Sequence, residues 1–279
     1  MFANLSCGAI GHAVAYEREI ELASANGFAG VDLNVDWALK AGAAATRAAV
    51  EGAKLRFGGF GLSVRWREAD SERDFADSLE GFTRACRIAA DLGVTRCTTW
   101  VMPCSQTLTY RQHVALVVPR LRAAAQILGG FGQRLGLEFI GPRSLRAATP
   151  HAFVHTMDGM RALATAIGPN VGLLLDSWHW HTAQASPRDI AQLDPADVVY
   201  VHLNDAPAGV AIDDLKDNQR ELPTATGVID LAGFFAALRA LKYDGPVTIE
   251  PFNAALRALP VEAAVAQTKA ALDRALKAT

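Results

Sequence analysis

The feature that most constrains the fold of this chain is a set of four apolar segments in its second half, each ending at an ionisable residue. Val171–Leu175 runs into Asp176, and the other three segments end at Glu138, His202 and Glu250. Continuous apolar runs of this length are typical of strands that are buried on both faces of a parallel sheet. The carboxyl ends of such strands lie at one edge of the sheet, where α/β folds place their chemistry. The pattern therefore predicts that these four side chains converge on one site.

Strand-like and helix-like segments alternate along the whole chain. The expected strands are residues 2–6, 31–34, 55–64 and 95–101, together with the four runs that end at residues 138, 176, 202 and 250. Segments with helical spacing follow them, and several stop at a glycine. The expected helices are residues 16–26, 37–52, 72–92, 109–128, 153–167, 187–193, 231–241 and 261–276. Pro119 is expected to kink the fourth of these helices or to end its first segment.

This alternation sets the fold class. Apolar strands that alternate strictly with helices predict an α/β protein with a parallel sheet covered by helices. Eight such units favour a closed (β/α)8 TIM barrel, although the pattern alone also allows an open doubly wound sheet. No GxGxxG motif follows the first strand, and no GxxxxGK[ST] motif is present. No linker rich in serine, glycine or proline divides the chain, so residues 1–279 are expected to form a single domain.

The composition argues against several classes of function. Hydrophobic residues make up 51% of the chain and charged residues 20%, which supplies a large core. The net charge of −2, without a long run of one sign, gives no electrostatic footprint for nucleic acid or a membrane surface. The four cysteines lack paired spacing and indicate reduced thiols, and neither a signal peptide nor a membrane-spanning run is evident. We expect a cytoplasmic protein with no nucleic-acid or membrane partner.

The four strand ends have the chemistry of a metal site. Three carboxylates that lie close together repel one another, and burial raises the cost of ionising each of them. A divalent cation removes that cost, and an oxygen-rich ligand set with one imidazole suits Mn²⁺, Mg²⁺ or Co²⁺. Any one of these residues alone is more often a helix cap, a solvated loop residue or a core histidine. The occurrence of four at successive strand ends, with nothing comparable after the first four strands, favours the metal site.

Several segments around these strand ends resemble the xylose isomerase-like sugar phosphate isomerase/epimerase superfamily. The resemblance spans most of the chain and is strongest over residues 135–252. The matching segments are Leu137-Glu138-Phe139, Leu175-Asp176-Ser177-Trp178-His179, Val201-His202-Leu203-Asn204-Asp205, Glu221–Asp230 and Tyr243–Phe252.

The resemblance implies a TIM barrel with one divalent metal ion bound by Glu138, Asp176, His202 and Glu250. Mn²⁺ is the expected ion, with Mg²⁺, Co²⁺ or Zn²⁺ as alternatives. In the ketose 3-epimerase and inosose dehydratase-like branch, the two glutamates also act as acid and base on opposite faces of the substrate, through an enediolate. The histidine three residues after the aspartate, here His179, contacts the substrate in that branch.

One position departs from the ketose 3-epimerase pattern. That branch has an arginine six residues after the metal-binding histidine, where this chain has Ala208. Arg220, later in the same long loop, is a candidate replacement for that cation. Its alternative role is that of a solvated loop residue.

Loops after the early strands are expected to shape the substrate pocket. The candidate residues there are His12, Asn34, Arg65, Trp66, Trp100 and Met102. Trp66, Trp100 and Trp178 are candidates for apolar walls against a sugar face, and their alternative role is packing at the barrel rim.

The expected function is a metal-dependent isomerase or epimerase of a small sugar or hydroxy-carbonyl compound, with Glu138 and Glu250 as acid and base. The metal polarises a carbonyl and acidifies the neighbouring C–H group. A dehydratase of the inosose or 3-dehydroshikimate type begins with the same proton abstraction and stays open as an alternative. An endonuclease IV-like enzyme needs extra histidines that the early strands lack, and a non-enzymatic barrel would bind no metal tightly. A homo-oligomer, dimer or tetramer, is compatible with the apolar helix 261–276.

Overall fold

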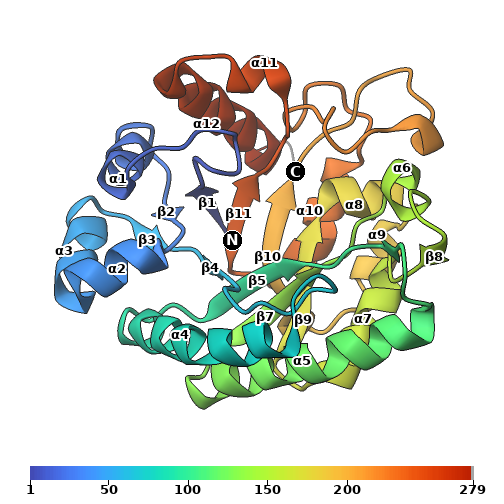
Figure 1. Cartoon of the computed structure of the whole chain (residues 1–279). Coiled ribbons are helices and arrows are strands. Elements are labelled where there is room, and N and C mark those ends of the chain that lie inside the picture. Colours follow the sequence, from blue (N-terminus) through green and yellow to red (C-terminus); the bar gives the residue numbers. More distant parts are fainter. Residues whose placement is uncertain (278–279) are drawn as a thin grey trace.

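The computed structural model describes residues 1–277 and has the architecture of a (β/α)8 TIM barrel. Its main sheet has nine strands in the order β3-β2-β1-β11-β10-β9-β7-β5-β4, and all neighbouring pairs are parallel. The strands are β1 Phe2–Leu5, β2 Gly30–Val31, β3 Arg56–Phe57, β4 Phe60–Gly61, β5 Arg96–Trp100, β7 Arg134–Glu138, β9 Val171–Asp176, β10 Val198–Leu203 and β11 Pro246–Ile249. Helices surround this sheet on its outer side (Figure 1).

The barrel closes through two consecutive glycines. The outermost strands of the sheet order, β3 and β4, are parts of one segment and are separated only by Gly58 and Gly59. Gly58 N–H donates to Val31 O at 2.8 Å, and Leu33 N–H donates to Gly59 O at 2.8 Å, so the segment continues its pairing with β2. Because β4 pairs with β5 on its other side, this segment joins the two edges of the sheet.

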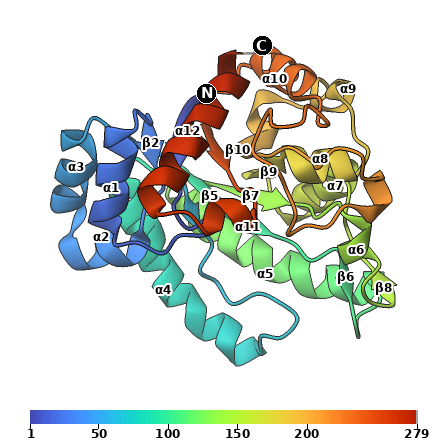
Figure 2. The same ribbon diagram turned by 90° about the horizontal axis from the view of Figure 1, so that it is seen from above.

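An outer ring of helices covers the strands, and the first and last helices of the chain are neighbours in it. The helices are α1 Tyr16–Ala25, α2 Val35–Ala41, α3 Ala43–Gly52, α4 Glu72–Asp91, α5 Tyr110–Gly130, α6 Arg143–Arg146, α7 Met157–Ile167, α8 Ser177–Thr182, α9 Pro187–Ile190, α10 Leu231–Ala240, α11 Ala254–Arg257 and α12 Val261–Lys277. The last helix, α12, packs against both α1 and α10, as Figure 2 shows from above. None of the helices in residues 1–277 combines the length and apolar character needed to cross a bilayer.

Three local features differ from the sequence prediction. The helix expected over 37–52 is two helices, because Gly42 at φ +84° ends α2 and begins α3. Pro119 does not end a first segment of the fourth helix, since α5 continues through it to Gly130, and the predicted alternative, a kink, stays a prediction. The strand expected over 55–64 is interrupted by the glycine pair. The structure also has a short antiparallel pair, β6 Cys104–Ser105 and β8 His151–Ala152, which the alternation does not predict.

Aliphatic side chains of the parallel strands form the centre of the core. Leu135, Leu137, Leu173, Leu175 and Val201 are all fully buried. This burial explains why the runs are apolar at every position instead of alternating with polar residues. The four cysteines are unpaired and buried, as the spacing predicts.

Candidate metal centre

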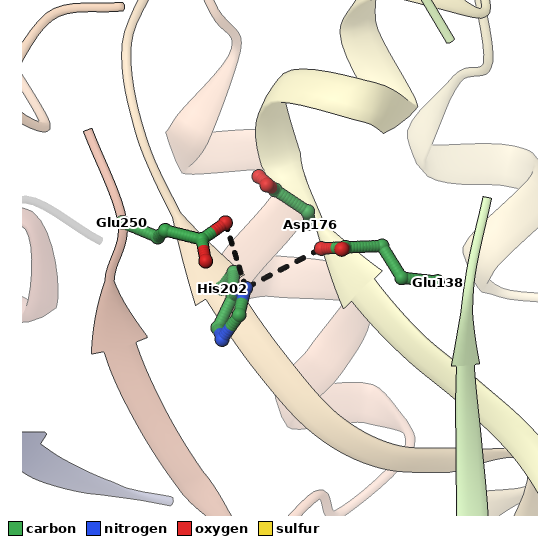
Figure 3. A group of neighbouring side chains, drawn as sticks. All are labelled: Glu138, Asp176, His202 and Glu250. Carbon is green, nitrogen blue, oxygen red and sulfur yellow. Dashed lines mark ion pairs between the residues drawn. The ribbon is translucent and has the colours of Figure 1, made fainter. Parts of the chain in front are cut away.

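Four side chains converge at one mouth of the barrel, where β7, β9, β10 and β11 end. Glu138 ends β7, Asp176 ends β9, His202 is the penultimate residue of β10, and Glu250 follows β11. Each offers one ligand atom such that all four atoms lie within 4.8 Å of one another. Figure 3 shows the carboxyl groups of Glu250 and Glu138 on opposite sides of the His202 ring, with Asp176 beside them. Within residues 1–277, this is the one group of three or more such side chains.

Asp176 is fixed in place by the start of α8 and by the neighbouring strand. Its Oδ1 accepts hydrogen bonds from Trp178 N–H at 2.8 Å and from Asn204 Nδ2 at 3.0 Å. The Ser177 hydroxyl donates to Asn204 O and accepts from Asn204 N–H, which ties the ends of β9 and β10 together. The segments Asp176-Ser177-Trp178 and Asn204-Asp205 therefore hold the carboxylate in one orientation.

Two buried atoms of the cluster lack a hydrogen-bond partner within the described part of the chain. They are Glu138 Oε1 and His202 Nδ1. These atoms lie 3.3 Å apart, and His202 Nδ1 lies 3.4 Å from Glu250 Oε2, but the contacts do not have hydrogen-bond geometry. Buried polar atoms normally have partners. Unpartnered oxygen and nitrogen atoms that face one another fit a divalent cation held by three carboxylates and one imidazole.

The pKa shifts of the cluster also indicate that its buried carboxylates lack enough positive charge around them. Burial raises the pKa of Glu138 to about 7, and the carboxylates of Glu250 and Asp176 add to the effect. Burial also raises the pKa of Asp176, against the opposing effect of Arg220. Burial alone would lower the pKa of His202, but Glu250 and Glu138 outweigh it and raise this pKa well above its ordinary value. For Glu250, the positive charges of His202 and Arg220 outweigh burial and lower the pKa.

Arg220 lies inside the site and not in solvent. Its side chain is 1% exposed. Nη1 donates to Asp176 Oδ2 at 2.8 Å and to the Glu250 carbonyl at 3.0 Å, and Nη2 donates to Asp217 Oδ1 at 2.9 Å. The guanidinium also lies over the Phe252 ring, 4.4 Å from its centroid. Arg220 therefore neutralises part of the carboxylate charge and is not a solvated loop residue, while its role in substrate binding stays a prediction.

Asp205 holds the long loop that carries Arg220 over the mouth of the barrel. The backbones of Asp205 and Glu221 pair in an isolated antiparallel bridge, with N–H to O distances of 2.8 and 2.9 Å. The buried Asp205 carboxylate accepts N–H groups of the returning loop, from Thr226 at 3.0 Å, Gly227 at 2.8 Å and Ile229 at 3.1 Å. A loop that would otherwise be solvated is thereby folded back onto the barrel.

His179 is buried beside Arg220 and is neutral. Burial lowers its pKa well below the ordinary value, and the charges of Arg220 and His202 lower it further. Its Nδ1 accepts the Gly141 N–H at 3.3 Å, while its Nε2 lies 3.3 Å from Arg220 Nη2. A neutral imidazole carries one N–H, so one ring nitrogen is an acceptor and the other a donor. The Gly141 N–H and the Arg220 guanidinium can both only donate, so they compete for the single acceptor nitrogen of the neutral ring.

A cavity of about 310 Å³ opens onto the metal cluster and is called here the apolar hollow. Its apolar walls are Trp100, Met102, Ile140, Leu145 and Phe252. Its polar lining consists of Glu138, His179, Asp217, Arg220 and Glu250. Trp100, Met102 and Phe252 are each about two-fifths exposed, at 43%, 39% and 45%. Exposed apolar groups around a polar centre are typical of ligand sites.

The remaining predicted pocket residues lie elsewhere. Trp66 is 3% exposed and Trp178 is fully buried, and both pack in the core. His12 is half-buried, and its Nε2 lies 3.5 Å from Leu256 O. None of these three residues lines the apolar hollow. Their substrate-binding roles stay predictions.

The sequence prediction missed three residues at the mouth. Asp217 pairs with Arg220, Phe252 has φ +40° and walls the apolar hollow, and Asp32 follows β2 at the opposite side of the mouth. Asp32 lies inside the strand expected over residues 31–34, so its position in the sequence did not mark it as a strand end. It is not part of the four-residue cluster.

Comparison with known proteins finds relatives that are named as enzymes. The model of the family described as xylose isomerase-like TIM barrel matches residues 20–276. An inosose isomerase of Bacillus subtilis is 24% identical over 204 residues, which cover 73% of this chain and 69% of that protein. A 3-dehydroshikimate dehydratase of Pseudomonas aeruginosa is 41% identical over 96 residues. That stretch covers 34% of this chain and only 15% of the dehydratase.

Solved structures give the same fold over the full length. A xylose isomerase domain protein from Alicyclobacillus acidocaldarius superposes with a TM-score of 0.87 at 29% identity, covering 99% of this chain and 98% of that one. The IolI protein, solved with a bound zinc atom, superposes with a TM-score of 0.80 at 20% identity, covering 100% and 99%. The family match spans most of the described barrel, including all four residues of the cluster. The chain belongs to the xylose isomerase-like TIM barrel family.

Proposed function

We propose that this protein is a divalent-metal-dependent isomerase or epimerase of a small polyhydroxylated carbonyl compound. The observation that carries the proposal is the cluster of Glu138, Asp176, His202 and Glu250, whose ligand atoms lie within 4.8 Å of one another at the barrel mouth. These residues would hold the metal, for which Mn²⁺ is our first choice and Mg²⁺, Co²⁺ and Zn²⁺ are alternatives. When bound, such an ion polarises a substrate carbonyl and acidifies the neighbouring C–H group.

Glu138 and Glu250 are suited to move the proton. They approach the centre of the site from opposite sides of His202, at 3.3 and 3.4 Å from its Nδ1. The pKa of Glu250 is lowered and that of Glu138 is raised to about 7. Carboxyl groups that approach a bound substrate from opposite sides can act as its base and its acid. In our proposal Glu250 accepts the proton from carbon and Glu138 supplies one to the other face.

The neighbouring residues orient the substrate. His179 lines the apolar hollow and would contact the substrate there, and Arg220 fixes the carboxylates of Asp176 and Glu250 by direct hydrogen bonds. Trp100 and Phe252 would cover an apolar C–H face of the substrate and exclude water from it. Return of the proton to the same carbon on the opposite face gives an epimer, and return to the adjacent carbon gives an isomer.

A dehydratase is the second candidate. The observation that favours it is the stretch of 96 residues that is 41% identical to a 3-dehydroshikimate dehydratase. The reaction would begin with the same abstraction of a proton by a glutamate. A β-hydroxyl group would then leave as water after receiving a proton from the second glutamate, and a carbon–carbon double bond would form. The metal cluster serves both reactions equally.

Proton NMR in D₂O separates the two candidates. Mn²⁺-activated protein would be incubated with ketoses, inososes and 3-dehydroshikimate in turn, and the ion would be removed before spectra are recorded. We expect deuterium at the carbon next to the carbonyl together with a new epimer or isomer. A new alkene signal with loss of a hydroxyl group would instead establish the dehydratase. Absence of both changes across the panel, in protein that also fails to retain a divalent metal, would refute catalysis.

A further inference from the structure

A second hollow reaches the metal cluster from the side of the early strands. This polar hollow, of about 380 Å³, is lined among others by Ser6, Asp32, Thr98, His202, Glu250 and Phe252. Glu250 and Phe252 line the apolar hollow as well, so the two hollows adjoin at the cluster. The apolar hollow offers aromatic and aliphatic walls, whereas the polar hollow offers oxygen atoms. A substrate bound at the cluster would face both.

Asp32 is held rigidly at the wall of the polar hollow. Its Oδ1 accepts hydrogen bonds from Asn4 Nδ2 at 3.0 Å and from Gly59 N–H at 2.9 Å. The Tyr200 hydroxyl lies 2.8 Å from Oδ1 and 2.9 Å from Oδ2. Donors from three different barrel segments therefore fix a carboxylate before any ligand arrives, which is how a preorganised binding group is built.

The second carboxylate oxygen of Asp32 has acceptor capacity to spare. Tyr200 has one hydroxyl hydrogen, which the two oxygens of Asp32 must share, because either hydroxyl can donate in its contact with Thr248 Oγ1. Oδ1 already has two N–H donors, whereas no donor other than Tyr200 reaches Oδ2 within the described residues. A carboxylate oxygen has room for about two hydrogen bonds. Oδ2 can therefore accept a hydrogen bond from a ligand hydroxyl group.

The glycine pair that closes the barrel makes this arrangement possible. A Cβ atom on Gly58 would lie 2.5 Å from Asp32 Oδ1 and 2.6 Å from Asn4 Oδ1. Any side chain at this position would therefore displace the carboxylate. Gly58 therefore both helps to close the sheet and leaves room for the Asp32 carboxylate.

The charges of the two hollows select against an anionic ligand. Among the residues that line them, Arg220 is the one arginine and there is no lysine. Its guanidinium is already paired with Asp176, Asp217 and Glu250. Asp32 and Glu250 give the polar hollow negative charge. Even with a divalent ion bound, the five carboxylates of Asp32, Glu138, Asp176, Asp217 and Glu250 outnumber the three positive charges of the ion and Arg220, so a carboxylate or phosphate on the substrate would meet net negative charge.

We propose that Asp32 is a specificity-determining residue that accepts a hydrogen bond from a ring hydroxyl of a neutral polyhydroxylated ketone of the inosose class. The two hollows together exclude carboxylated substrates such as 3-dehydroshikimate. This inference rests on the proposed function and names the substrate class of that site. It also narrows the choice between the two candidate reactions, because a 3-dehydroshikimate dehydratase must bind a carboxylate.

Calorimetric titration of Mn²⁺-loaded protein tests the inference through binding. Inosose, 3-dehydroshikimate and a set of deoxy-inososes, each lacking one hydroxyl group, would be titrated into wild type, Asp32→Ala and Asp32→Asn. Asp36→Ala is the matched control, because Asp36 is an exposed carboxylate on α2 that lines neither hollow. Thermal unfolding of each variant checks that the barrel is intact, and Asp32→Asn preserves the volume if Asp32→Ala does not fold.

We expect both Asp32 variants to bind inosose more weakly, Asp32→Ala by roughly 10- to 100-fold, the range for a hydrogen bond to a charged group. The control should bind like wild type. One deoxy-inosose should bind wild type more weakly by a similar factor and lose little more in Asp32→Ala, which a purely structural role would not produce.

Three results would overturn the inference: inosose affinity unchanged in both Asp32 variants, 3-dehydroshikimate bound by wild type as tightly as inosose, or no binding of inosose at all. The failure of the proposed function looks different. Inosose would then bind with the expected dependence on Asp32, but no deuterium would enter it. An Arg257→Gln variant adds a further check, because Arg257 is an exposed arginine in a neighbouring hollow. Loss of 3-dehydroshikimate binding in that variant would also overturn the exclusion of anions.

Discussion

The late and early strands of the barrel end at the same mouth but supply different chemistry. Strands β7 to β11 end in Glu138, Asp176, His202 and Glu250, all of which can bind a metal or move a proton. On the early side, Trp100 offers an apolar surface and Asp32 offers a carboxylate that internal hydrogen bonds already fix. The difference teaches that the late half holds all the groups proposed for the reaction, whereas the early half offers groups suited only to recognition. Substitutions in the late half should abolish turnover, and those in the early half should change which substrate is bound.

The largest effect is expected from the late half. Glu138→Gln keeps the volume of the side chain but removes both a charged ligand and a proton carrier. We expect deuterium exchange into the substrate to fall by roughly 100- to 10,000-fold, the range for loss of a general acid or base. The measurement is the initial rate of exchange by NMR at saturating Mn²⁺. An exchange rate within a fewfold of wild type would contradict the assigned role.

A second prediction concerns the buried cation of the late half. Arg220→Met leaves Asp176, Asp217 and Glu250 without their shared cation in a buried place. Loss of one partner of a buried ion pair costs about 3–5 kcal/mol, so the metal-free variant should unfold at clearly lower denaturant concentration. Mn²⁺ should restore part of the loss.

Arg143→Met is the matched control for this substitution. Arg143 pairs with Asp213 at 3.2 Å on the surface, where the two side chains are 61% and 45% exposed. Such pairs contribute about 0–1 kcal/mol. Equal destabilisation by the two substitutions would show that Arg220 is not the electrostatic centre of the mouth.

The third prediction is a pH dependence of metal binding. Burial raises the pKa of Glu138 to about 7, so in the metal-free protein this carboxyl group is protonated below that pH. His202, whose pKa is also raised, must lose a proton as well before it can act as a ligand. Metal binding releases these protons, so affinity for Mn²⁺ should fall by about tenfold or more per pH unit as the pH drops below about 7. Calorimetry between about pH 5.5 and 7.5 measures this, and a flat profile would contradict it.

The same shift predicts how the stability of the metal-free protein changes with pH. The pKa of Glu138 is higher in the folded chain than its ordinary value of 4.5. Its contribution to stability is therefore fully present below about pH 4.5 and is lost as the pH rises through about 7. Burial shifts the pKa of Asp176 in the same direction. Saturating Mn²⁺ should offset this loss above about pH 7, which thermal unfolding with and without the ion would reveal.

The smallest effect is expected from the early half. Trp100→Ala removes an exposed wall of the apolar hollow without touching the metal cluster. An aromatic contact is worth about 0.5–1.5 kcal/mol, so KM should rise roughly 2- to 10-fold while metal affinity stays constant. Tyr110→Ala is the control, because Tyr110 is 56% exposed and packs on Phe153 away from the hollow. A similar rise in KM for both variants would show that Trp100 has no special role.

The late half could be predicted from the sequence because its signal is local. Each apolar run fixes a strand, and the residue that ends the run is then placed by the geometry of the barrel. The early half has strands of only two residues at β2, β3 and β4. Because such short strands give a weak sequence pattern, the sequence predicts Asp32 inside a strand and not at the end of one. Its position depends on Asn4, Gly58 and Tyr200, which are distant in sequence.

Arg220 shows a different limit of sequence prediction. Its residue type suggested either a site cation or a solvated side chain, and only the folded loop decides between them. The bridge between Asp205 and Glu221 and the hydrogen bonds of the Asp205 carboxylate return the loop to the barrel. These contacts span 16 to 24 residues, a separation at which local patterns give no information.

Titration of chelator-treated protein with Mn²⁺ by calorimetry is the most direct test of the central claim that the four late strand ends form one divalent-metal site. Wild type and Asp176→Asn would be compared at about pH 7.5, above the raised pKa of Glu138. We predict one Mn²⁺ per chain in wild type, with affinity reduced at least roughly tenfold when this buried carboxylate is neutralised. Equal affinity in the two proteins, or no stoichiometric binding in wild type, would contradict the metal site and the reaction built on it.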